Sequence, residues 1–402
     1  MKTYSKITPE GARDLLFEEC RARREVQEKL SRVFGLRGYR EVITPGLEYF
    51  DVFNLPGTAI PQQEMYKCTD NHGRLIVFRP DSTLPIARMA ASRLQGHRKP
   101  LRFFYSQTIY RNRPDLSGRS DESAQMGIEL MGAGGLRADL EVIALAVEAL
   151  SACAPDFRME IGHARFFQVL ADQLPLSAAA QEELRATIES KNYAALSELL
   201  DPLGDLPAAK AMAQLPRLFG GEEVFGKAYE LFSENGALEC LDYLHGLYED
   251  LRQLGLEDRV IIDLGLVNQA EYYTGLIFRG YFDGIGEPVL SGGRYDNLLG
   301  EFGAPLSATG FAVNIDPAAQ VVGEPAPQTP DILVFSDERH LPEAVNYIKS
   351  LTENGLVAEN CVYDDFDAAA DYARRRGIRQ LHVVDDAIEA VDVETLRGEG
   401  AR

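Results

Sequence analysis

The chain has 402 residues and a formal net charge of −21, from 41 Lys and Arg against 62 Asp and Glu. Hydrophobic residues make up 45% of the sequence, which is enough for packed cores and excludes a chain that is disordered by composition. The acidic excess argues against a nucleic-acid-binding protein and against docking on an anionic membrane, because both of these polyanions require a basic surface.

Targeting and metal-binding patterns do not occur in the sequence. The first residues, MKTYSKITPEGARD, lack the apolar core of a signal peptide, and no run of about 18 apolar residues predicts a transmembrane helix. The 5 Cys and 6 His residues are scattered, with no CxxC, HxxxH or HExxH spacing. The absence of these spacings argues against disulfides and against a zinc site. We therefore expect a cytoplasmic protein without a metal.

The first 164 residues alternate between helical and strand patterns. Periodicity predicts helices over 18–37, 83–95 and 138–152, and strands over 39–44, 75–78, 101–111 and 124–132. The two long strands are joined by a polar, Gly-containing loop and should form an antiparallel pair. Asp81 or Ser82 stands where the N-cap of the second helix is expected.

The middle of the chain changes character at about residue 165. Residues 165–257 are rich in Ala, Leu, Glu and Lys, contain few strand formers, and predict several helices inserted into the fold. Strand patterns then resume over 260–265, 272–282, 288–293 and 308–316.

The clearest linker in the chain is PAAQVVGEPAPQTP, at 317–330, which holds four prolines. A β-α-β-α-β pattern follows it and predicts a small parallel sheet with helices. The predicted organisation is an α+β chain with four parts. These are a core at 1–164 and 258–317, a helical insertion at 165–257, a linker at 318–330 and a small α/β domain at 331–402.

Familiar catalytic motifs are missing: no GxGxxG follows a strand in the right setting, and neither GxxxxGK[ST] nor GxSxG occurs. The first candidate cluster is Arg79, Asp81 and Thr83, at the end of a strand. Acidic and hydroxyl groups there could bind an ammonium group, or they could simply cap the following helix.

A second cluster surrounds the predicted strand pair. Arg111 carries a guanidinium fork that suits carboxylates and phosphates. Gln125 and Glu129 are four residues apart in a strand, so their side chains point to the same face. They flank apolar Met126 and Ile128, which favours a buried polar pair in need of a partner over a solvated face.

The third cluster combines tyrosines with a glycine pair. Tyr272 and Tyr273 precede one strand, and Tyr295 follows Gly292-Gly293. Such residues can form the wall of a small-ligand pocket, with an apolar ring and a hydroxyl handle. Plain sheet packing is the alternative for each tyrosine.

Taken together, several segments carry a family resemblance. In chain order they are GYREVITPGLEYFDVF, LIVFRPDST, YRNRP, GRSDESAQMGIELMG, YYTGLIFRGYFDG, LSGGRYDNLLGEFG and ATGFAVNID. They resemble the catalytic core of class II histidyl-tRNA synthetases, including the paralogues that serve as regulatory subunits of ATP phosphoribosyltransferase, the first enzyme of histidine biosynthesis. The resemblance covers nearly all of 5–317 and implies a core of antiparallel sheet flanked by helices. The C-terminal segment is similar to a shortened anticodon-binding domain.

The departures from the synthetase pattern fall on the groups that serve ATP. Arg113 stands where the family has Glu, Ser123 where it has the adenine-stacking Phe, and Asn268 where it has the catalytic Arg. The arginine of the family's third motif falls on Pro317, and no Arg or Lys occurs in 295–338. Adenylation needs cations at the α-phosphate, and each lost donor costs roughly 3 kcal/mol of barrier. The resemblance thus implies a chain with no catalytic residues and no cofactor.

The groups that would hold histidine are better preserved. By resemblance, the ammonium group of L-histidine is held by Asp81 and Thr83 and further by Gln125 and Glu129. The imidazole is held by Tyr272, Tyr273 and Tyr295, and Arg111 could meet the carboxylate. Asp81 replaces the usual Glu and reaches about one methylene less far.

A protein that binds histidine without activating it can only report its concentration, provided that two states bind histidine differently. The resemblance implies a dimer of this chain within a hetero-octamer, with the short-form catalytic subunit of ATP phosphoribosyltransferase as partner. Two alternatives are an active histidine–tRNA ligase and a tRNA-binding module. Residues 331–402 carry 16 acidic and 8 basic side chains, a net charge of −8 that suits neither.

Overall fold

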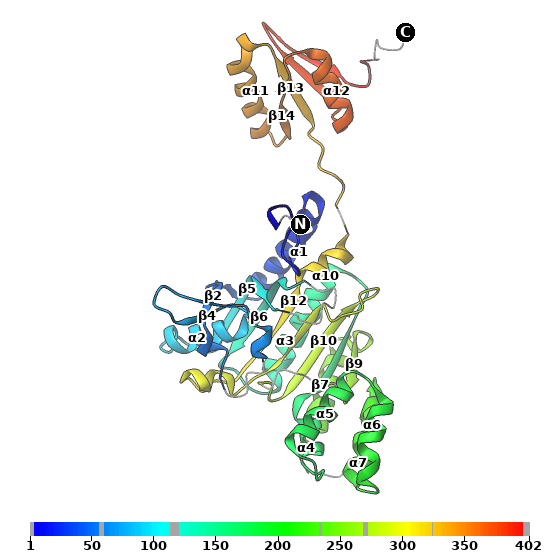
Figure 1. Cartoon of the computed structure of the whole chain (residues 1–402). Coiled ribbons are helices and arrows are strands. Elements are labelled where there is room, and N and C mark those ends of the chain that lie inside the picture. The colour runs from blue at the N-terminus through cyan, green and yellow to red at the C-terminus, as the bar shows by residue number, and fades with distance from the viewer. Residues whose placement is uncertain are drawn as a thin grey trace. The chain divides into compact units, whose positions relative to one another are not determined.

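A mixed β-sheet forms the centre of the N-terminal part of the chain (Figure 1). The computed structural model describes residues 4–55, 60–112, 120–232, 235–267, 272–323 and 325–396. Over those residues the sheet has nine strands in the order β1-β5-β6-β12-β11-β10-β7-β9-β8. Their bounds are β1 Arg40–Glu41, β5 Leu101–Tyr110, β6 Glu122–Met131, β12 Ala308–Asn314, β11 Leu290–Arg294, β10 Leu276–Phe282, β7 Phe157–His163, β9 Val260–Asp263 and β8 Phe219–Gly220.

The antiparallel run β5-β6-β12-β11-β10-β7 is the part of this sheet that carries the site. β5 and β6 pair over ten residues, with Gln107 opposite Gln125 and Phe103 opposite Glu129. The predicted antiparallel strand pair is confirmed, with its ends shifted by one or two residues. The strand predicted over 39–44 is reduced to β1, Arg40–Glu41.

Three helices pack together on the sheet: α1 (Phe17–Leu36), α3 (Leu136–Cys153) and α10 (Ile315–Val322). The buried residues of α1 recur every four positions, at Ala22, Val26, Leu30 and Phe34, so they form one apolar stripe. This stripe belongs to the same core as β6 and α3.

The expected linker at 318–330 begins with helix rather than with extended chain. α10 continues to Val322 because Ile315, Pro317 and Ala318 are buried and it packs against α1. Proline is tolerated in the first turn of a helix, where its missing N–H is not needed.

A small second sheet and a helix complete the region around the site. β2 (Leu47–Tyr49), β4 (Leu75–Phe78) and β3 (Lys67–Thr69) form an antiparallel sheet, and α2 (Thr83–Arg93) follows β4. Leu84, Ile86 and Ala87 of α2 share a core with Phe103 and Tyr105 of β5.

The segment between β7 and β9 is helical, as its composition indicates. Its helices are α4 (Ala164–Ala171), α5 (Ala178–Glu189), α6 (Tyr193–Leu200), α7 (Pro207–Gln214), α8 (Glu223–Leu231) and α9 (Asn235–Gln253). The two-residue β8 also lies in this segment and pairs with β9, so the segment supplies an edge strand that the sequence pattern did not indicate. The segment from Ala164 to Gln253 is called the helical insertion below.

The chain divides into two compact units, Met1–Glu324 and Pro325–Arg402. The second contains β13 (Ile332–Ser336), α11 (Leu341–Glu353), β14 (Ala358–Asn360), α12 (Phe366–Arg376), β15 (Gln380–Val384) and β16 (Ile388–Asp392). β13, β14 and β15 are parallel, in the predicted β-α-β-α-β order, and β16 adds an antiparallel edge strand that was not predicted. Within the described residues, no helix is both long and apolar enough to cross a membrane.

Candidate functional site

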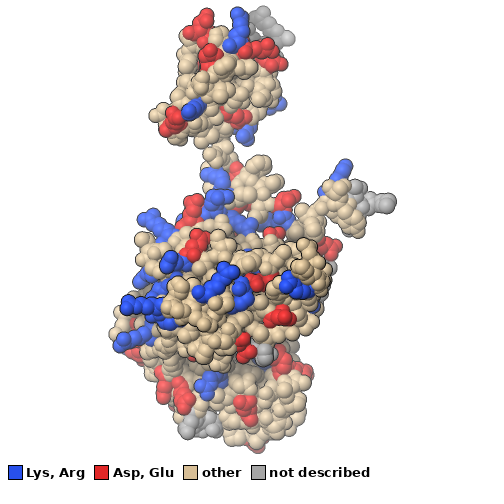
Figure 2. All heavy atoms as spheres, turned by 90° about the vertical axis from the view of Figure 1, so that its left-hand side faces the viewer, with Lys and Arg blue, Asp and Glu red and all other residues tan. Residues whose placement is uncertain are grey.

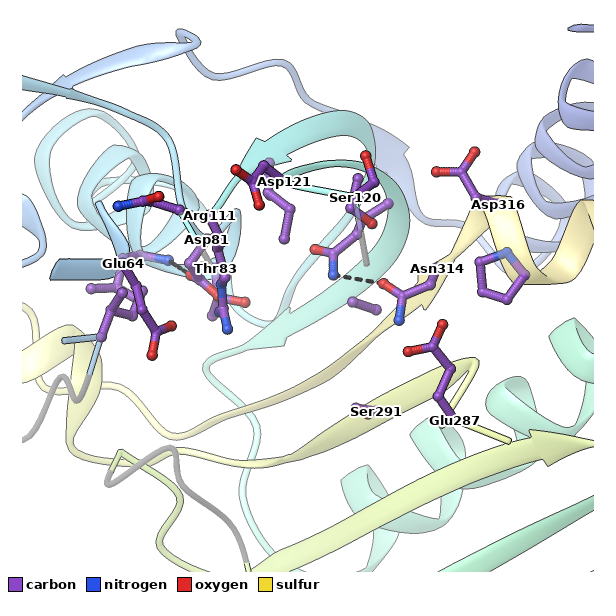
Figure 3. Close-up of a pocket in the computed structure, with 18 of the residues that line it drawn as sticks. Glu64, Asp81, Thr83, Arg111, Ser120, Asp121, Glu287, Ser291, Asn314 and Asp316 are labelled. Carbon is purple, nitrogen blue, oxygen red and sulfur yellow. Dashed lines mark hydrogen bonds between the residues drawn. The ribbon is translucent and has the colours of Figure 1, made fainter. Parts of the chain in front are cut away.

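A cavity of about 1300 Å³ lies on the main sheet within the first unit (Figure 3). β6, β11 and β12 contribute lining residues, and so do the start of α2 and the N-terminal segment around Gly11. All eight residues that the sequence predicts for histidine binding line this one cavity, although they come from segments up to two hundred residues apart. They are Asp81, Thr83, Arg111, Gln125, Glu129, Tyr272, Tyr273 and Tyr295.

Glu129 is the central buried acid of the cavity, with 1% of its surface exposed. The Thr83 hydroxyl donates to Glu129 Oε1 at 2.8 Å, and the Tyr295 hydroxyl donates to Oε2. Burial is the main cause that raises the pKa of Glu129 to about 8, although both hydroxyl donors act in the opposite direction. The carboxyl group therefore holds a proton at neutral pH and can become a carboxylate when a cation arrives.

Glycines make room for these groups on the neighbouring strands. A Cβ atom at Gly310 of β12 would lie 2.2 Å from Glu129 Oε2, and one at Gly293 of β11 would lie 2.7 Å from the Tyr273 ring. Glycine inside a strand is the sequence signal for such a close approach. The sequence pattern points to Gly293, beside the tyrosines, but not to Gly310.

Asp81 both caps α2 and lines the cavity. Its Oδ1 accepts a hydrogen bond of 2.9 Å from the Leu84 amide, which is the capping contact of a helix N-terminus. Burial raises the pKa of Asp81, while the nearby Arg111 favours its charged form. The two interpretations offered for this cluster therefore describe the same side chain.

Arg79 does not line the cavity and instead holds the backbone together behind it. It is 5% exposed, and its guanidinium donates to the carbonyl oxygens of Thr44, Pro45 and Thr108. These bonds join the strand ends behind the cavity. Arg111, by contrast, donates from Nε to the Pro80 carbonyl at 3.0 Å and lines the cavity next to Asp81 (Figure 3).

The three tyrosines form an aromatic wall. The ring centroids of Tyr272 and Tyr273 are 4.7 Å apart, and those of Tyr272 and Tyr295 are 5.9 Å apart in an edge-to-face arrangement. Burial raises the pKa of all three phenols, so they stay neutral hydrogen-bonding groups. Tyr105 of β5, which the sequence analysis did not select, also lines the cavity and is 1% exposed.

Gln125 lies away from this cluster although it shares the cavity. Its Nε2 donates to Asn314 Oδ1 at 2.9 Å, and Figure 3 shows Asn314 beside Ser291 and Glu287 on the side opposite Asp81. Four strand residues span roughly 13 Å, so Gln125 and Glu129 cannot both contact one ammonium group.

The lining of the cavity as a whole is acidic, and Glu287 and Asp316 form an acidic wall on its Gln125 side (Figure 3). Over the described lining residues nine are acidic and two are basic, and the two basic residues are Arg13 and Arg111. Arg13 is paired with Glu19, and Asp316 lies 3.5 Å from Arg23. Pro317 forms part of this wall, where the resemblance leads one to expect an arginine.

Two of the positions that depart from the synthetase pattern, Arg113 and Asn268, lie outside the described residues. Ser123 is described and lines the cavity. No group of three or more His, Cys, Asp or Glu side chains that could hold a metal ion occurs among the residues that the structure describes.

Comparisons with known proteins give the family of the chain. The family model described as histidyl-tRNA synthetase matches residues 11–318. ATP phosphoribosyltransferase regulatory subunits from Clostridium acetobutylicum and Clostridium kluyveri are 39% and 36% identical, over 96% and 95% of this chain and 97% and 100% of theirs. A Bacillus halodurans crystal structure, described as an ATP phosphoribosyltransferase regulatory subunit/histidyl-tRNA synthetase, aligns with a TM-score of 0.82 at 32% identity, covering 92% of this chain and 97% of that one. The chain therefore belongs to the histidyl-tRNA synthetase family and, within it, to the ATP phosphoribosyltransferase regulatory subunits.

Proposed function

We propose that this chain is a non-catalytic, histidine-binding regulatory subunit that confers feedback inhibition by histidine on ATP phosphoribosyltransferase. Catalysis on ATP and phosphoribosyl pyrophosphate takes place on the short-form catalytic subunit. The observation that carries the proposal is the single cavity that joins the eight histidine-type residues to an acidic wall. Sensing requires that histidine bind two states of the complex with different affinities.

The side chains of the cavity match the three polar groups of L-histidine. Asp81 and Thr83 suit the ammonium group, and Arg111 suits the carboxylate. The buried Glu129 and the tyrosine wall suit the imidazole, which has an apolar ring and donates from nitrogen. Gln125 is far enough from Glu129 along β6 to contact the opposite end of the same ligand.

The acidic wall supports the absence of adenylation. Transfer to an α-phosphate requires preorganised cations, each worth roughly 3 kcal/mol of barrier. Glu287, Asp316 and Pro317 are among the described lining residues, and carboxylates in the cavity repel a triphosphate. An active histidine–tRNA ligase is the alternative. It predicts histidine-dependent exchange of pyrophosphate into ATP, and we expect none.

The decisive experiment mixes the chain with a short-form catalytic subunit and measures phosphoribosyl transfer with and without L-histidine. We expect transfer to depend on this chain and to be inhibited by histidine only in the complex. Transfer that proceeds without this chain, and that is equally insensitive to histidine, would rule the proposal out. A Tyr273→Ala variant should assemble normally and lose the inhibition.

We also propose that the chain dimerises within a hetero-octamer through the surface of β1, β2 and β4. Large apolar side chains are exposed in the chain segments next to these strands: Leu36, the last residue of α1, at 78%, and Ile43, which follows β1, at 77%. Tyr49 and Phe78 extend this apolar surface, and Lys and Arg side chains gather on the same side of the molecule (Figure 2). Such apolar patches on soluble proteins mark interfaces.

Substitution tests this interface. We expect Ile43→Asp to produce a monomer in sedimentation velocity experiments, because a charge inside an apolar interface is unpaired and desolvated. Tyr193→Asp, at an exposed apolar residue of the helical insertion, is the matched control and should leave the dimer intact.

The basic side of the molecule is the one feature that favours a polyanion. Residues 1–112 carry 19 Lys and Arg and 12 Asp and Glu, whereas the rest of the chain is strongly acidic. Measuring the retention of tRNA at low salt distinguishes the regulatory subunit from the tRNA-binding alternative. We expect no more retention than for a protein of equal net charge, and specific retention would support the tRNA-binding alternative.

A further inference from the structure

A buried polar network joins the helical insertion to the core next to the cavity. Asp139, near the start of α3, has no exposed surface. The Arg294 guanidinium contacts it twice, from Nε at 3.0 Å and from Nη2 at 2.6 Å. The Tyr243 hydroxyl of α9 donates to the same carboxylate. One charged pair of the core thus has its third partner in the insertion.

The same arginine holds the backbone that carries the tyrosine wall. Its Nη1 donates to Asp296 Oδ1 at 2.9 Å, and its carbonyl accepts from the Thr274 amide at 2.8 Å. The Asp296 amide in turn donates to the Thr274 hydroxyl at 3.0 Å. Tyr295 lies between these anchored residues, and Tyr273 directly precedes Thr274. A shift of Arg294 therefore moves both tyrosines.

The fit around Arg294 leaves little freedom for independent motion. A Cβ atom at Gly275 would lie 3.1 Å from Arg294 Cδ, so the arginine stem packs directly on the backbone that follows the tyrosine pair. The guanidinium is nearly fully buried, and moving it away from Asp139 would leave an unpaired charge. The network therefore moves as one body.

A second attachment lies at the other side of the insertion. Glu189, the last residue of α5, lines the cavity. Its carboxylate is paired with Arg185 at 2.8 Å and with Arg279 of β10 at 3.3 Å. The insertion thus supplies one residue of the cavity wall and is tied to the sheet beside it.

We infer that the Tyr243–Asp139–Arg294 network couples the docked position of the helical insertion to ligand occupancy of the cavity. Tyr243 and Arg294 act as positioning residues, since neither is among the described residues that line the cavity. The inference rests on the proposed histidine site and adds the element that responds to it. Coupling between two sites is reciprocal. A ligand that fixes Tyr295 therefore stabilises the docked insertion, and releasing the insertion lowers the affinity for the ligand by the same factor.

Hydrogen exchange of the full-length chain with and without L-histidine tests this coupling. In the native chain we expect histidine to slow exchange in β6 and also in α9 and α5 of the insertion. In Tyr243→Phe, which removes one hydroxyl and keeps the ring beside His163, we expect protection of β6 to remain and protection of the insertion to be lost. The dissociation constant for histidine, measured by calorimetry, should rise several-fold.

Tyr229→Phe is the matched control. It removes another tyrosine–aspartate hydrogen bond of the insertion, from Tyr229 to Asp242 at 2.7 Å, which is exposed and has no contact with Arg294. It should behave like the native chain in both measurements. Faster exchange throughout the chain in both variants would overturn the inference, because it would show only that both substitutions lower the overall stability.

The remaining outcomes separate this inference from the proposed function. If the native chain binds histidine without protecting the insertion, or if Tyr243→Phe retains that protection, the coupling is refuted and the histidine site stands. If the native chain binds no histidine, the proposed function fails and the coupling fails with it.

Discussion

At the residue scale, Glu129 determines how the cavity responds to a cation. It is buried, accepts from two hydroxyl groups and has a pKa raised to about 8. A raised carboxyl pKa means that burial penalises the charged form more than the donors favour it. We therefore expect Glu129 to hold a proton in the ligand-free cavity and to become a carboxylate when a hydrogen-bond donor of the ligand binds.

The first prediction concerns Glu129→Gln, which keeps the shape and removes the charge. We expect histidine binding to weaken by 10- to 100-fold or more, in line with roughly 1.5–3 kcal/mol for a charge-assisted hydrogen bond. Between pH 4.5 and about 8, native Glu129 is protonated in the folded chain but ionised in the unfolded chain. The free energy of unfolding of the native chain therefore falls as the pH rises through that window. The variant has no such loss, and its thermal unfolding temperature at pH 7 should equal or exceed that of the native chain.

The second prediction is proton release on binding. Below pH 8 the free cavity carries protonated Glu129, and a neutral imidazole that donates its N–H to this group favours the carboxylate without taking up a proton itself. Histidine binding should therefore release up to one proton at pH 7, and its affinity should fall as the pH is lowered from 8. Calorimetry in buffers with different ionisation enthalpies measures this proton. An enthalpy that does not depend on the buffer would contradict the assignment.

At the scale of the elements, the close packing of β12 against β6 creates the room for the acid. Gly310 lies opposite Glu129 in the register, and its missing side chain leaves space for the carboxylate. The same strand runs on into α10, which packs on α1 and places Pro317 in the cavity wall. One strand thus serves both the histidine side and the acidic side.

The third prediction is that Gly310→Ala blocks the cavity. The added methyl would lie 2.2 Å from Glu129 Oε2 and 2.3 Å from the Ile128 carbonyl, and backbone cannot move away cheaply. We expect loss of histidine binding together with destabilisation of about 1–3 kcal/mol, the usual cost of overpacking. Gly226→Ala is the control, since a Cβ atom there meets nothing within 4 Å and should stabilise its helix slightly. Denaturant unfolding of both variants measures the difference.

At the scale of the whole molecule, the described residues that line the cavity all belong to the first compact unit, Met1–Glu324. The second unit carries its own parallel sheet and its own core, around Leu333 and Leu381. Charge is also divided along the chain, since the first 112 residues are net basic and the last segment is net acidic.

The fourth prediction follows from this division. A chain that ends at residue 324 should bind L-histidine with the same affinity as the full chain, because no lining residue is removed. Calorimetry on the two chains makes the comparison. A weaker affinity in a folded truncated chain would mean that the second unit takes part in the site.

The sequence by itself determined the order of most elements and singled out eight of the residues that line the cavity. Local periodicity is sufficient for strands such as β4 and β5 and for helices such as α2 and α3, because apolar spacing reports which face is buried. The eight candidate residues followed from motif order, and they meet in one cavity. Short strands such as β8 and β16 were not predicted from the sequence, because they form only by pairing with another strand.

Only the tertiary structure decided which partners the cavity residues contact. Sequence spacing placed Gln125 and Glu129 on one face, but their partners, Asn314 and the Thr83–Tyr295 pair, come from strands and a helix far along the chain. The same holds for Gly310 as the space beside Glu129 and for Tyr243 as the contact of the insertion with Asp139. Register and burial across the sheet are long-range properties, and they set both the pKa of Glu129 and the path from the insertion to the site.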